Sequence, residues 1–145
     1  MKMSTRGRYG LRVMLELALR EGEGPVPVEE IAARQGISAH YIHLLVPVLR
    51  RAGLVRTVRG PKGGCFLSRH PSEISLLEVV EAVEGKTAPV ECVADEGFCV
   101  QAGGCAAREV WSEVASAVEG VLGGVTLEEL AARQRKRPAA VNWQI

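Results

Sequence analysis

The sequence predicts a mainly α-helical fold with one small β-hairpin, and three observations support this class. Apolar residues recur with helical spacing in five stretches, the first at residues 5–20 and the last at residues 105–122. Short β-rich runs flank a single glycine-rich turn within residues 54–68. Hydrophobic residues make up 47% of the chain and aromatic residues only 4%, so the core must be aliphatic. A chain of 145 residues forms one compact domain with room for a projecting element.

Three helices open the chain. The first is expected over residues 5–20, where apolar side chains cover more than half of the circumference. The second covers residues 28–35 and is followed by Gly36, which suits the left-handed end of a helix. Ser38 is a good N-cap for the third helix, expected over residues 39–52. The second and third helices form a helix-turn-helix pattern, which any αα-corner can imitate.

The third helix contains a residue that breaks the helical rule. Pro47 removes a backbone hydrogen bond in mid-helix, so we expect a kink or a slack turn near His43. The residues expected on the buried face of this helix are Tyr41, Ile42, Leu44, Leu45, Val48 and Leu49.

A hairpin with a cationic tip follows, within residues 54–68. Gly63 and Gly64 allow the backbone to come close to a phosphate. Arg59 and Lys62 supply charge, and an arginine can enter a narrow minor groove. Its position directly after a helix-turn-helix favours a wing over a plain hairpin with a soluble tip.

Charge is divided unevenly along the chain. Residues 1–70 carry 12 Lys/Arg and five Asp/Glu, a net charge of +7. Residues 71–145 carry six Lys/Arg and 12 Asp/Glu, a net charge of −6. This division favours a polyanionic partner for the first half over an accidental segregation of solvated charges.

The second half contains one long amphipathic helix. A fourth helix is expected over residues 74–84, followed by a loop over residues 86–104 that is long enough to be either disordered or functional. The helix over residues 105–122 carries an apolar stripe of Val110, Trp111, Val114, Val118, Val121 and Leu122. A second copy of this helix is the expected partner, in a two-fold homodimer; the alternative is a helix folded back on its own domain.

The C-terminal region is expected to hold one more short helix. Thr126 and Glu129 form a capping-box pattern at its start. The tail over residues 133–145, with an isolated Trp143, is expected to be mobile. The expected units are a DNA-binding domain (1–85), a cysteine-rich loop (86–104), a dimerisation helix with the short terminal helix (105–132) and the tail (133–145).

Three of the four cysteines lie within fourteen residues. Cys92, Cys99 and Cys105 have the spacing C-x6-C-x5-C, and three thiolates from one flexible loop can wrap a soft metal or cluster. Zinc ligand pairs are usually about two to four residues apart, so these wider gaps favour an iron–sulfur cluster. The alternative is three unrelated cysteines. Cys65 is expected to point inward from the second hairpin strand, as a structural cysteine.

Cluster binding requires a fourth ligand that the cysteines do not supply. It could come from a carboxylate, a histidine, the partner chain or solvent. The side chains considered are Glu91, Asp95, Glu96, Glu109, His40 and His43.

No targeting or membrane segment is expected. The chain has no run of 18 apolar residues, and its N-terminus has no apolar signal region. We therefore expect a cytoplasmic protein without a membrane partner. In that compartment clustered cysteines bind metal or perform redox chemistry more often than they form disulfides.

Taken together, these motifs resemble the winged helix-turn-helix regulators that include IscR, NsrR, RirA and CymR. The matching stretches are MSTRGRYGLR (3–12), IAARQGIS (31–38), LRRAGLV (49–55), VRGPKGG (58–64), EISL (73–76) and the three-cysteine loop. The resemblance covers roughly residues 1–132. It implies a homodimer on a palindromic operator in double-stranded DNA, with the helix after Ser38 in the major groove and the hairpin in the minor groove. The expected DNA-contacting residues are Ser38, Ala39, His40, Tyr41, His43, Arg50, Arg59, Lys62, Gly63 and Gly64.

The resemblance also implies a cofactor. Cluster-bearing members bind a two-iron or four-iron cluster through three cysteines at the places of Cys92, Cys99 and Cys105, whereas CymR-like members lack this set. Arg108 stands where IscR has a ligating histidine, and Arg8 stands where NsrR has an aspartate that can ligate the cluster of the other subunit. Neither known fourth ligand therefore carries over to this chain. His43 occupies the place of an IscR glutamate that tunes operator choice, so it either contacts DNA or simply faces solvent.

The sequence thus predicts a DNA-binding transcription regulator whose operator affinity is controlled by an iron–sulfur cluster. The signal would be iron–sulfur status, nitric oxide or redox stress. The alternatives are a thiol-redox or zinc-responsive regulator that uses the same cysteines, a small iron–sulfur electron carrier or redox enzyme, and a protein-interaction adaptor. An enzyme is disfavoured because we find neither a nucleotide-binding loop nor a paired acid–base constellation.

Overall fold

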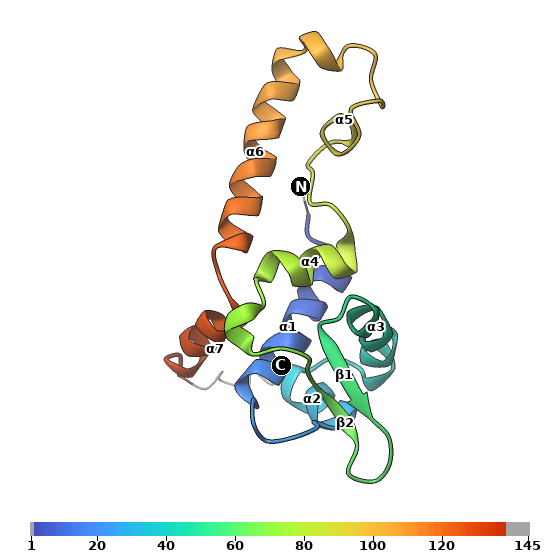
Figure 1. Ribbon diagram of the computed structural model, residues 1–145, viewed down its shortest axis with the longest axis vertical. Coiled ribbons are helices and arrows are strands. Elements are labelled where there is room, and N and C mark those ends of the chain that lie inside the picture. The colour runs from blue at the N-terminus through green and yellow to red at the C-terminus, as the bar shows by residue number, and fades with distance from the viewer. Residues whose placement is uncertain (1, 139–145) are drawn as a thin grey trace, which may run out of the picture.

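The computed structural model describes residues 2–138, and Trp143 with the end of the tail lies outside this range. The described residues form seven α-helices, two short 3₁₀ turns and one antiparallel hairpin (Figure 1). The elements are α1 Thr5–Leu19, α2 Val28–Gln35, α3 Ala39–Arg51, β1 Val55–Val58, β2 Gly64–Leu67, η1 Pro71–Glu73, α4 Leu76–Glu84, α5 Glu91–Ala94, η2 Ala102–Gly104, α6 Ala106–Gly123 and α7 Leu127–Arg135. The predicted mainly helical class is confirmed.

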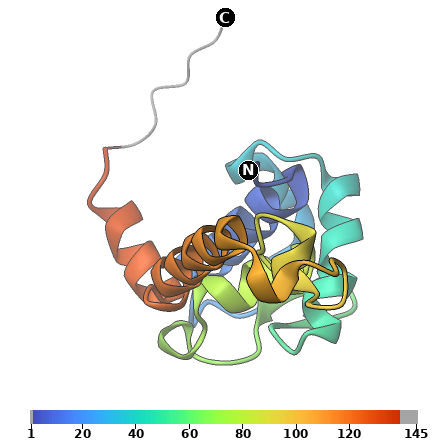
Figure 2. The same ribbon diagram turned by 90° about the horizontal axis from the view of Figure 1, so that it is seen from above.

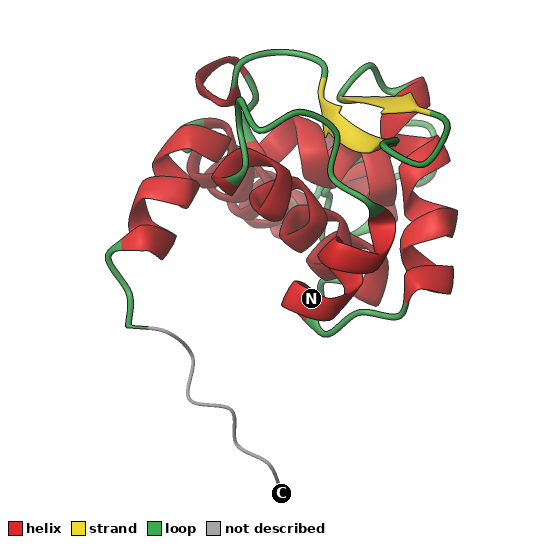
Figure 3. Ribbon diagram, turned by 90° about the horizontal axis from the view of Figure 1, so that it is seen from below, coloured by secondary structure: helices red, strands yellow, loops and turns green. Residues whose placement is uncertain are grey.

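One aliphatic core joins the N-terminal helices, the hairpin, α4 and α7. Helix α1 packs against α2, α3, α4, α7 and β2, while the two strands lie at the periphery of the helical body (Figure 3). The largest buried side chains are Met14, Ile31, Ile42, Leu45, Leu49, Leu54, Ile74 and Leu127. Because Leu127 begins α7, the core around the N-terminal helices and the hairpin takes one of its side chains from the C-terminal end of the chain.

The helix-turn-helix is formed by α2 and α3. Gly36 ends α2 in the left-handed conformation, at φ 62°, which residues with a side chain adopt at a cost. The Ser38 hydroxyl then accepts a hydrogen bond from the Tyr41 backbone N–H at 3.1 Å and caps α3. This local chemistry follows the sequence expectation closely.

Two expectations for α3 need correction. The helix runs through Pro47 without interruption, so the slack turn expected near His43 is absent; burial of Val46 and Leu49 on either side of the proline outweighs the lost hydrogen bond. Leu44, expected in the core, is 58% exposed. At about 100° per residue it lies opposite Ile42, which is fully buried.

The hairpin pairs β1 with β2 in antiparallel register, with Val55 opposite Leu67 and Thr57 opposite Cys65. Cys65 also exchanges two backbone hydrogen bonds of 2.8 Å with Val26, which fastens the hairpin to the segment before α2. The inward orientation expected for Cys65 is confirmed by its burial.

Capping boxes begin both α4 and α7. Ser75 pairs with Glu78, and Thr126 pairs with Glu129 as the sequence predicts. The backbones of the two cap residues run antiparallel, because Leu76 N–H bonds to Val125 and Leu127 N–H bonds to Ile74. This contact returns the chain to the body at the start of α7, after α6 has projected away from it. Helix α7 then continues to Arg135, past the boundary expected at residue 132.

Helix α6 and the cysteine loop project from the body (Figure 1). Ala115 is the only residue of this 18-residue helix that is buried. The one-turn helix α5, which the sequence did not predict, packs against α6, and Figure 2 shows the two side by side above the other helices. The exposed apolar side chains on α6 are Val110, Trp111 and Val121.

Candidate DNA interface and cysteine site

The exposed face of α3 carries a continuous stripe of side chains. His40, His43, Leu44, Arg50 and Arg51 are all exposed. Their spacings of three, four and seven residues place them on one side of a helix. His40, His43 and Arg50 were predicted as contacts, while Leu44 and Arg51 were not. The helical angle from the fully buried Ile42 and Leu49 could have identified both.

Three other predicted contacts at the start of α3 position this helix. The hydroxyl of Ser38 is engaged as the N-cap. The Tyr41 ring packs edge-on against the Tyr9 ring of α1, with centroids 5.5 Å apart and planes at 90°. Ala39 is partly buried against the core. These residues fix where the exposed stripe begins.

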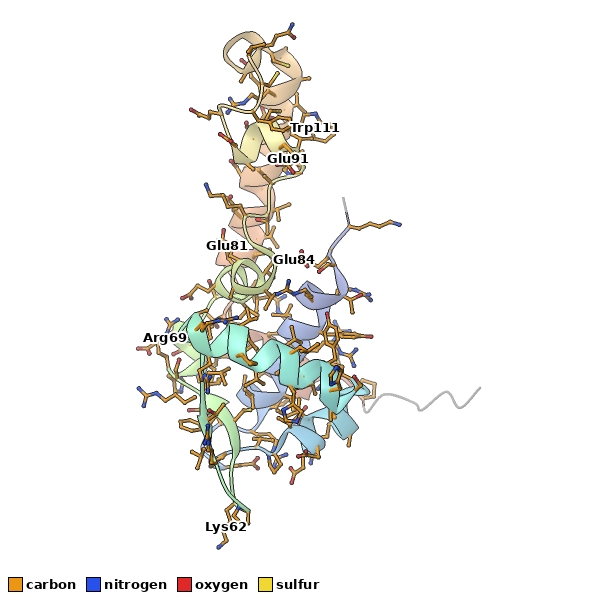
Figure 4. The ribbon with its side chains drawn as sticks, turned by 90° about the vertical axis from the view of Figure 1, so that its right-hand side faces the viewer. Lys62, Arg69, Glu81, Glu84, Glu91 and Trp111 are labelled. Atoms are coloured by element: carbon orange, nitrogen blue, oxygen red, sulfur yellow. The ribbon has the colours of Figure 1, made fainter. Side chains whose placement is uncertain are left out.

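The hairpin tip presents positive charge at one end of the molecule. Arg59 and Lys62 are exposed, and Lys62 lies at the extremity opposite Glu91 and Trp111 (Figure 4). The neighbouring residues Gly63 and Gly64 must be glycines for steric reasons. A Cβ on Gly63 would collide with the Val58 carbonyl, and one on Gly64, at φ +153°, would collide with the Val26 carbonyl.

A groove of about 360 Å³ separates α3 from the hairpin. His43 and Val46 line its helix side. Its hairpin side is lined by Thr57, Val58, Gly60, Pro61, Gly63 and Gly64. Where α3 ends, the Arg50 guanidinium donates to the Thr57 hydroxyl at 3.5 Å and links the helix to β1. The helix and the hairpin therefore form one surface.

This surface is strongly basic. Arg50, Arg51, Arg56, Arg59 and Lys62 are all exposed, and within residues 2–138 none of them forms a salt bridge. Their charges are available to a polyanion. Basic side chains on a helix and an adjacent hairpin suit the phosphates that flank a DNA groove.

The three cysteines lie at the opposite end of the molecule. Cys92 is in α5, Cys99 lies in the loop between α5 and η2, and Cys105 is the N-cap residue of α6. All three are free thiols of intermediate exposure. In the part of the chain that the structure describes, no three His, Cys, Asp or Glu side chains form a closed group of metal ligands.

The donor chemistry of this loop still fits a soft metal centre. Three free thiols on one short loop are the ligands that iron–sulfur clusters and thiophilic metals select. The loop brings the three thiols to one region of the molecule but does not arrange them around a common metal position.

The structure narrows the choice of a fourth ligand within one chain. His40 and His43 lie on α3 in the body, away from the loop (Figure 1). Glu96 faces the Arg108 guanidinium, and Asp95 Oδ1 accepts from the Gly97 N–H at 2.9 Å. Arg108 itself donates to the Cys92 carbonyl at 2.9 Å, a role in keeping with a side chain that cannot ligate iron.

Burial separates the fourth cysteine from the other three. Burial of the Cys65 thiol raises its pKa, and the nearby Glu29 carboxylate acts in the same direction. Its thiolate form is disfavoured, so Cys65 is the least suited of the four to react or to bind metal.

A helix-turn-helix followed by a basic hairpin, and closed by a projecting helix, defines a DNA-binding regulator of the winged-helix class. Comparison with known proteins gives the same answer in finer detail. The chain belongs to the Rrf2 family, whose profile, described as an iron-dependent transcriptional regulator, matches residues 3–133. The predicted family and the prediction of a non-enzyme are confirmed, because the relatives are named as transcriptional regulators.

Relatives named CymR and relatives named IscR both resemble this chain. The regulator CymR of Bacillus subtilis is 44% identical over 131 residues, which cover 90% of each chain. The regulator IscR of Photorhabdus laumondii is 40% identical over 134 residues, covering 92% of this chain and 81% of that one. A solved structure of CymR, described as the global cysteine regulator of B. subtilis, aligns with a TM-score of 0.77 and 41% identity over 92% of this chain and 98% of the other. Sequence identity over the whole chain therefore does not distinguish a CymR-like from an IscR-like protein.

A helix that crosses a membrane must be both long and apolar. None of the helices between residues 2 and 138 combines the length and the hydropathy that crossing a bilayer requires.

Proposed function

We propose that this transcription regulator binds a palindromic operator as a homodimer and that an iron–sulfur cluster held by Cys92, Cys99 and Cys105 controls its affinity. The observation that carries the proposal is the set of three free, partly exposed thiols on one loop, in a chain that matches an iron-dependent regulator family. We assign DNA binding to residues 1–85, sensing to residues 86–104 and dimerisation to residues 105–132. The protein would act where the DNA is, in the cytoplasm.

The DNA contacts follow from the basic surface. Helix α3 enters the major groove with His40, His43 and Arg50 toward the bases and phosphates. The hairpin tip places Arg59 and Lys62 at the adjacent minor groove. Gly63 and Gly64 keep the tip narrow, so that backbone as well as side chains can approach the phosphates.

Dimerisation uses the unpartnered face of α6. An 18-residue helix that buries only Ala115 leaves Val110, Trp111 and Val121 exposed, and a second copy of the same helix covers them in a two-fold arrangement. The dimer sets the distance between two copies of α3, which must match half-sites about 34 Å apart.

The chain's own residues give the cysteine loop its regulatory position. Cys105 is the N-cap residue of α6, so any ordering of the loop acts directly on the N-terminal end of the proposed dimerisation helix. A bound cluster, of two or four irons, would supply a redox-active and nitric-oxide-sensitive centre held by the three thiolates. The fourth ligand would come from a carboxylate, the partner chain or solvent.

A second candidate is a thiol-redox or zinc-responsive regulator that uses the same cysteines. Two observations favour it: the thiols do not converge in the described residues, and the CymR relative is described as a cysteine regulator. Reversible oxidation of two thiols in this loop to a disulfide would require that they approach each other and that an oxidant, such as a peroxide or another disulfide, take up the two electrons and two protons.

One preparation distinguishes these candidates. Protein purified without oxygen is analysed for iron, sulfide and zinc and by visible absorbance and Mössbauer spectroscopy, and its binding to its own promoter is measured by gel shift with and without metal. We expect iron and sulfide in the unchanged protein and loss of the visible absorbance in Cys99→Ala. Colour that survives this change rejects the ligand assignment. A colourless protein whose DNA binding responds to thiol oxidation or zinc supports the second candidate.

A further inference from the structure

We propose that Arg108 is the positioning residue of the cysteine site, because its guanidinium fastens the segment from Cys92 to Glu96 onto the first turn of α6. The same side chain is the one basic residue in the segment 87–132, which contains the three loop cysteines. The metal-binding part of this inference rests on the function proposed above, whereas the positioning part does not.

The contacts of Arg108 span the loop. Its Nε donates to the Cys92 carbonyl at 2.9 Å, across sixteen residues of sequence, and its Nη2 lies 3.5 Å from Glu96 Oε1. The Arg108 side chain is 22% exposed, so it lies against the loop, whereas Glu96 is 88% exposed and its ion pair is weakened by solvent. The bond to the Cys92 carbonyl is therefore the stronger tie.

Among the described residues, Arg108 alone makes hydrogen bonds that link this loop to a residue distant in sequence. Within the described residues, every other hydrogen bond of residues 86–104 joins partners at most four positions apart, such as the bond from Asp95 N–H to Glu91 at 2.8 Å. Helix α5 has a single turn and no side-chain cap, so it is not stable by itself and leaves carbonyls without partners. Arg108 satisfies one of those carbonyls, at Cys92.

The distribution of charge around the loop is the second reason to assign a positioning role to Arg108. Residues 87–132 contain eight acidic residues and one basic residue, Arg108. Three thiolates would add further negative charge to this region. A cation in the first turn of a helix also opposes the helix dipole. Contacts with the loop, rather than the stability of α6, account for an arginine at this place.

Hydrogen exchange of metal-free protein tests the tie directly. We expect Arg108→Ala to speed amide exchange of residues 91–98 by roughly tenfold or more, because a charge-assisted hydrogen bond is lost. Arg108→Lys keeps the charge and one donor, and should stay within about threefold of the unchanged protein. Arg135→Ala, an arginine on α7, is the matched control and should change nothing in the loop. Far-UV circular dichroism establishes that each variant is folded, and Glu96→Gln measures the ion pair alone.

Unchanged exchange in Arg108→Ala, or a lysine variant as fast as the alanine variant, would overturn the proposal. Iron release to a chelator gives a second readout after anaerobic reconstitution: several-fold faster release from Arg108→Ala than from Arg108→Lys is expected, and equal rates would reject the role toward the metal. If the unchanged protein takes up no iron, the cluster proposal fails while the exchange result still decides whether Arg108 positions the loop.

Discussion

Burial gives Cys65 a chemistry different from that of the other three cysteines. It is 2% exposed on β2, whereas Cys92, Cys99 and Cys105 are partly exposed. We expect iodoacetamide to label those three in native, metal-free protein and to spare Cys65, since a buried thiol with a raised pKa offers little thiolate. Peptide mass mapping after labelling, with an unfolded sample as reference, checks this. Labelling of Cys65 at the same rate would contradict it.

The raised pKa of Cys65 also predicts how stability depends on pH. The folded state holds the Cys65 proton more tightly than the unfolded state, whose thiol titrates near its ordinary value of 9.0. The resulting stabilisation is fully present below that pH and is lost as pH rises through the folded pKa. Urea unfolding between pH 7.5 and 10.5 should show a steeper loss for the unchanged protein than for Cys65→Val. Parallel slopes for the two proteins would exclude this contribution.

Leu44 belongs to the exposed stripe of α3, which we propose faces DNA, and its position suggests a specific base contact. An exposed leucine between His40 and Arg51 can pack on the C5-methyl group of a thymine in the major groove. After an operator is selected from random DNA, replacing one thymine by deoxyuridine should weaken binding about fourfold, since burial of one methyl-sized group is worth about 0.8 kcal/mol. Leu44→Ala should be insensitive to that replacement. If every deoxyuridine site affects both proteins equally, Leu44 makes no such contact.

These residues mark where sequence reasoning succeeded and failed. The inward orientation of Cys65 follows from strand alternation and was predicted. Leu44 was placed in the core because it is apolar, although the helical angle from Ile42 assigns it to the opposite face. The interaction of Arg108 with Cys92 could not be predicted, because it depends on how a loop folds across sixteen residues.

At the scale of elements, the hairpin is the part most dependent on its glycines. Gly64→Ala forces a side chain into a left-handed position against the Val26 carbonyl, and we expect it to destabilise the protein by about 1–3 kcal/mol. Urea unfolding measures the change. Gly103→Ala is the matched control, since Gly103 has no positive φ and no atom near the place of a Cβ. Equal stabilities for the two variants would show that the hairpin can relax.

The charge on the hairpin tip predicts a measurable salt effect. Arg59→Ala should weaken DNA binding and lower the slope of log affinity against log salt concentration by about one, if Arg59 contacts one phosphate. Arg20→Ala is a suitable control, because its guanidinium is already paired with Glu23 at 2.7 Å and Glu30 at 2.5 Å. Titrations at several salt concentrations provide the slopes, and an unchanged slope for Arg59→Ala would reject the contact.

Elements with explicit end signals were predictable from sequence. The Ser38 cap, the left-handed Gly36 and the Thr126–Glu129 box all lie where their residue types indicate. Helix α5 was missed because four residues without a capping side chain have no periodicity to detect. Burial of Val46 and Leu49 kept α3 continuous through Pro47, which local propensity alone cannot indicate.

At the scale of the whole molecule, the exposed face of α6 predicts the oligomeric state. Val121 is 69% exposed on a helix that we expect to pack against its own copy. Val121→Glu should shift the protein from dimer to monomer in analytical ultracentrifugation, because a buried carboxylate without a partner is costly. Ala132→Glu, on the exposed side of α7, should leave the dimer intact. A Val121→Glu protein that remains a dimer would remove this part of α6 from the interface.

The length of α6 has a mechanical consequence. Its 18 residues span about 27 Å, and the body meets the helix near its C-terminal end, where Gly123 lies beside Leu77. The helix therefore acts as a lever with its pivot at the body: a tilt of about 5° at the pivot moves Cys105 by about 2 Å. Because coupling between binding sites is reciprocal, a wing module clamped on DNA would restrict the same tilt and so limit the positions open to the thiols.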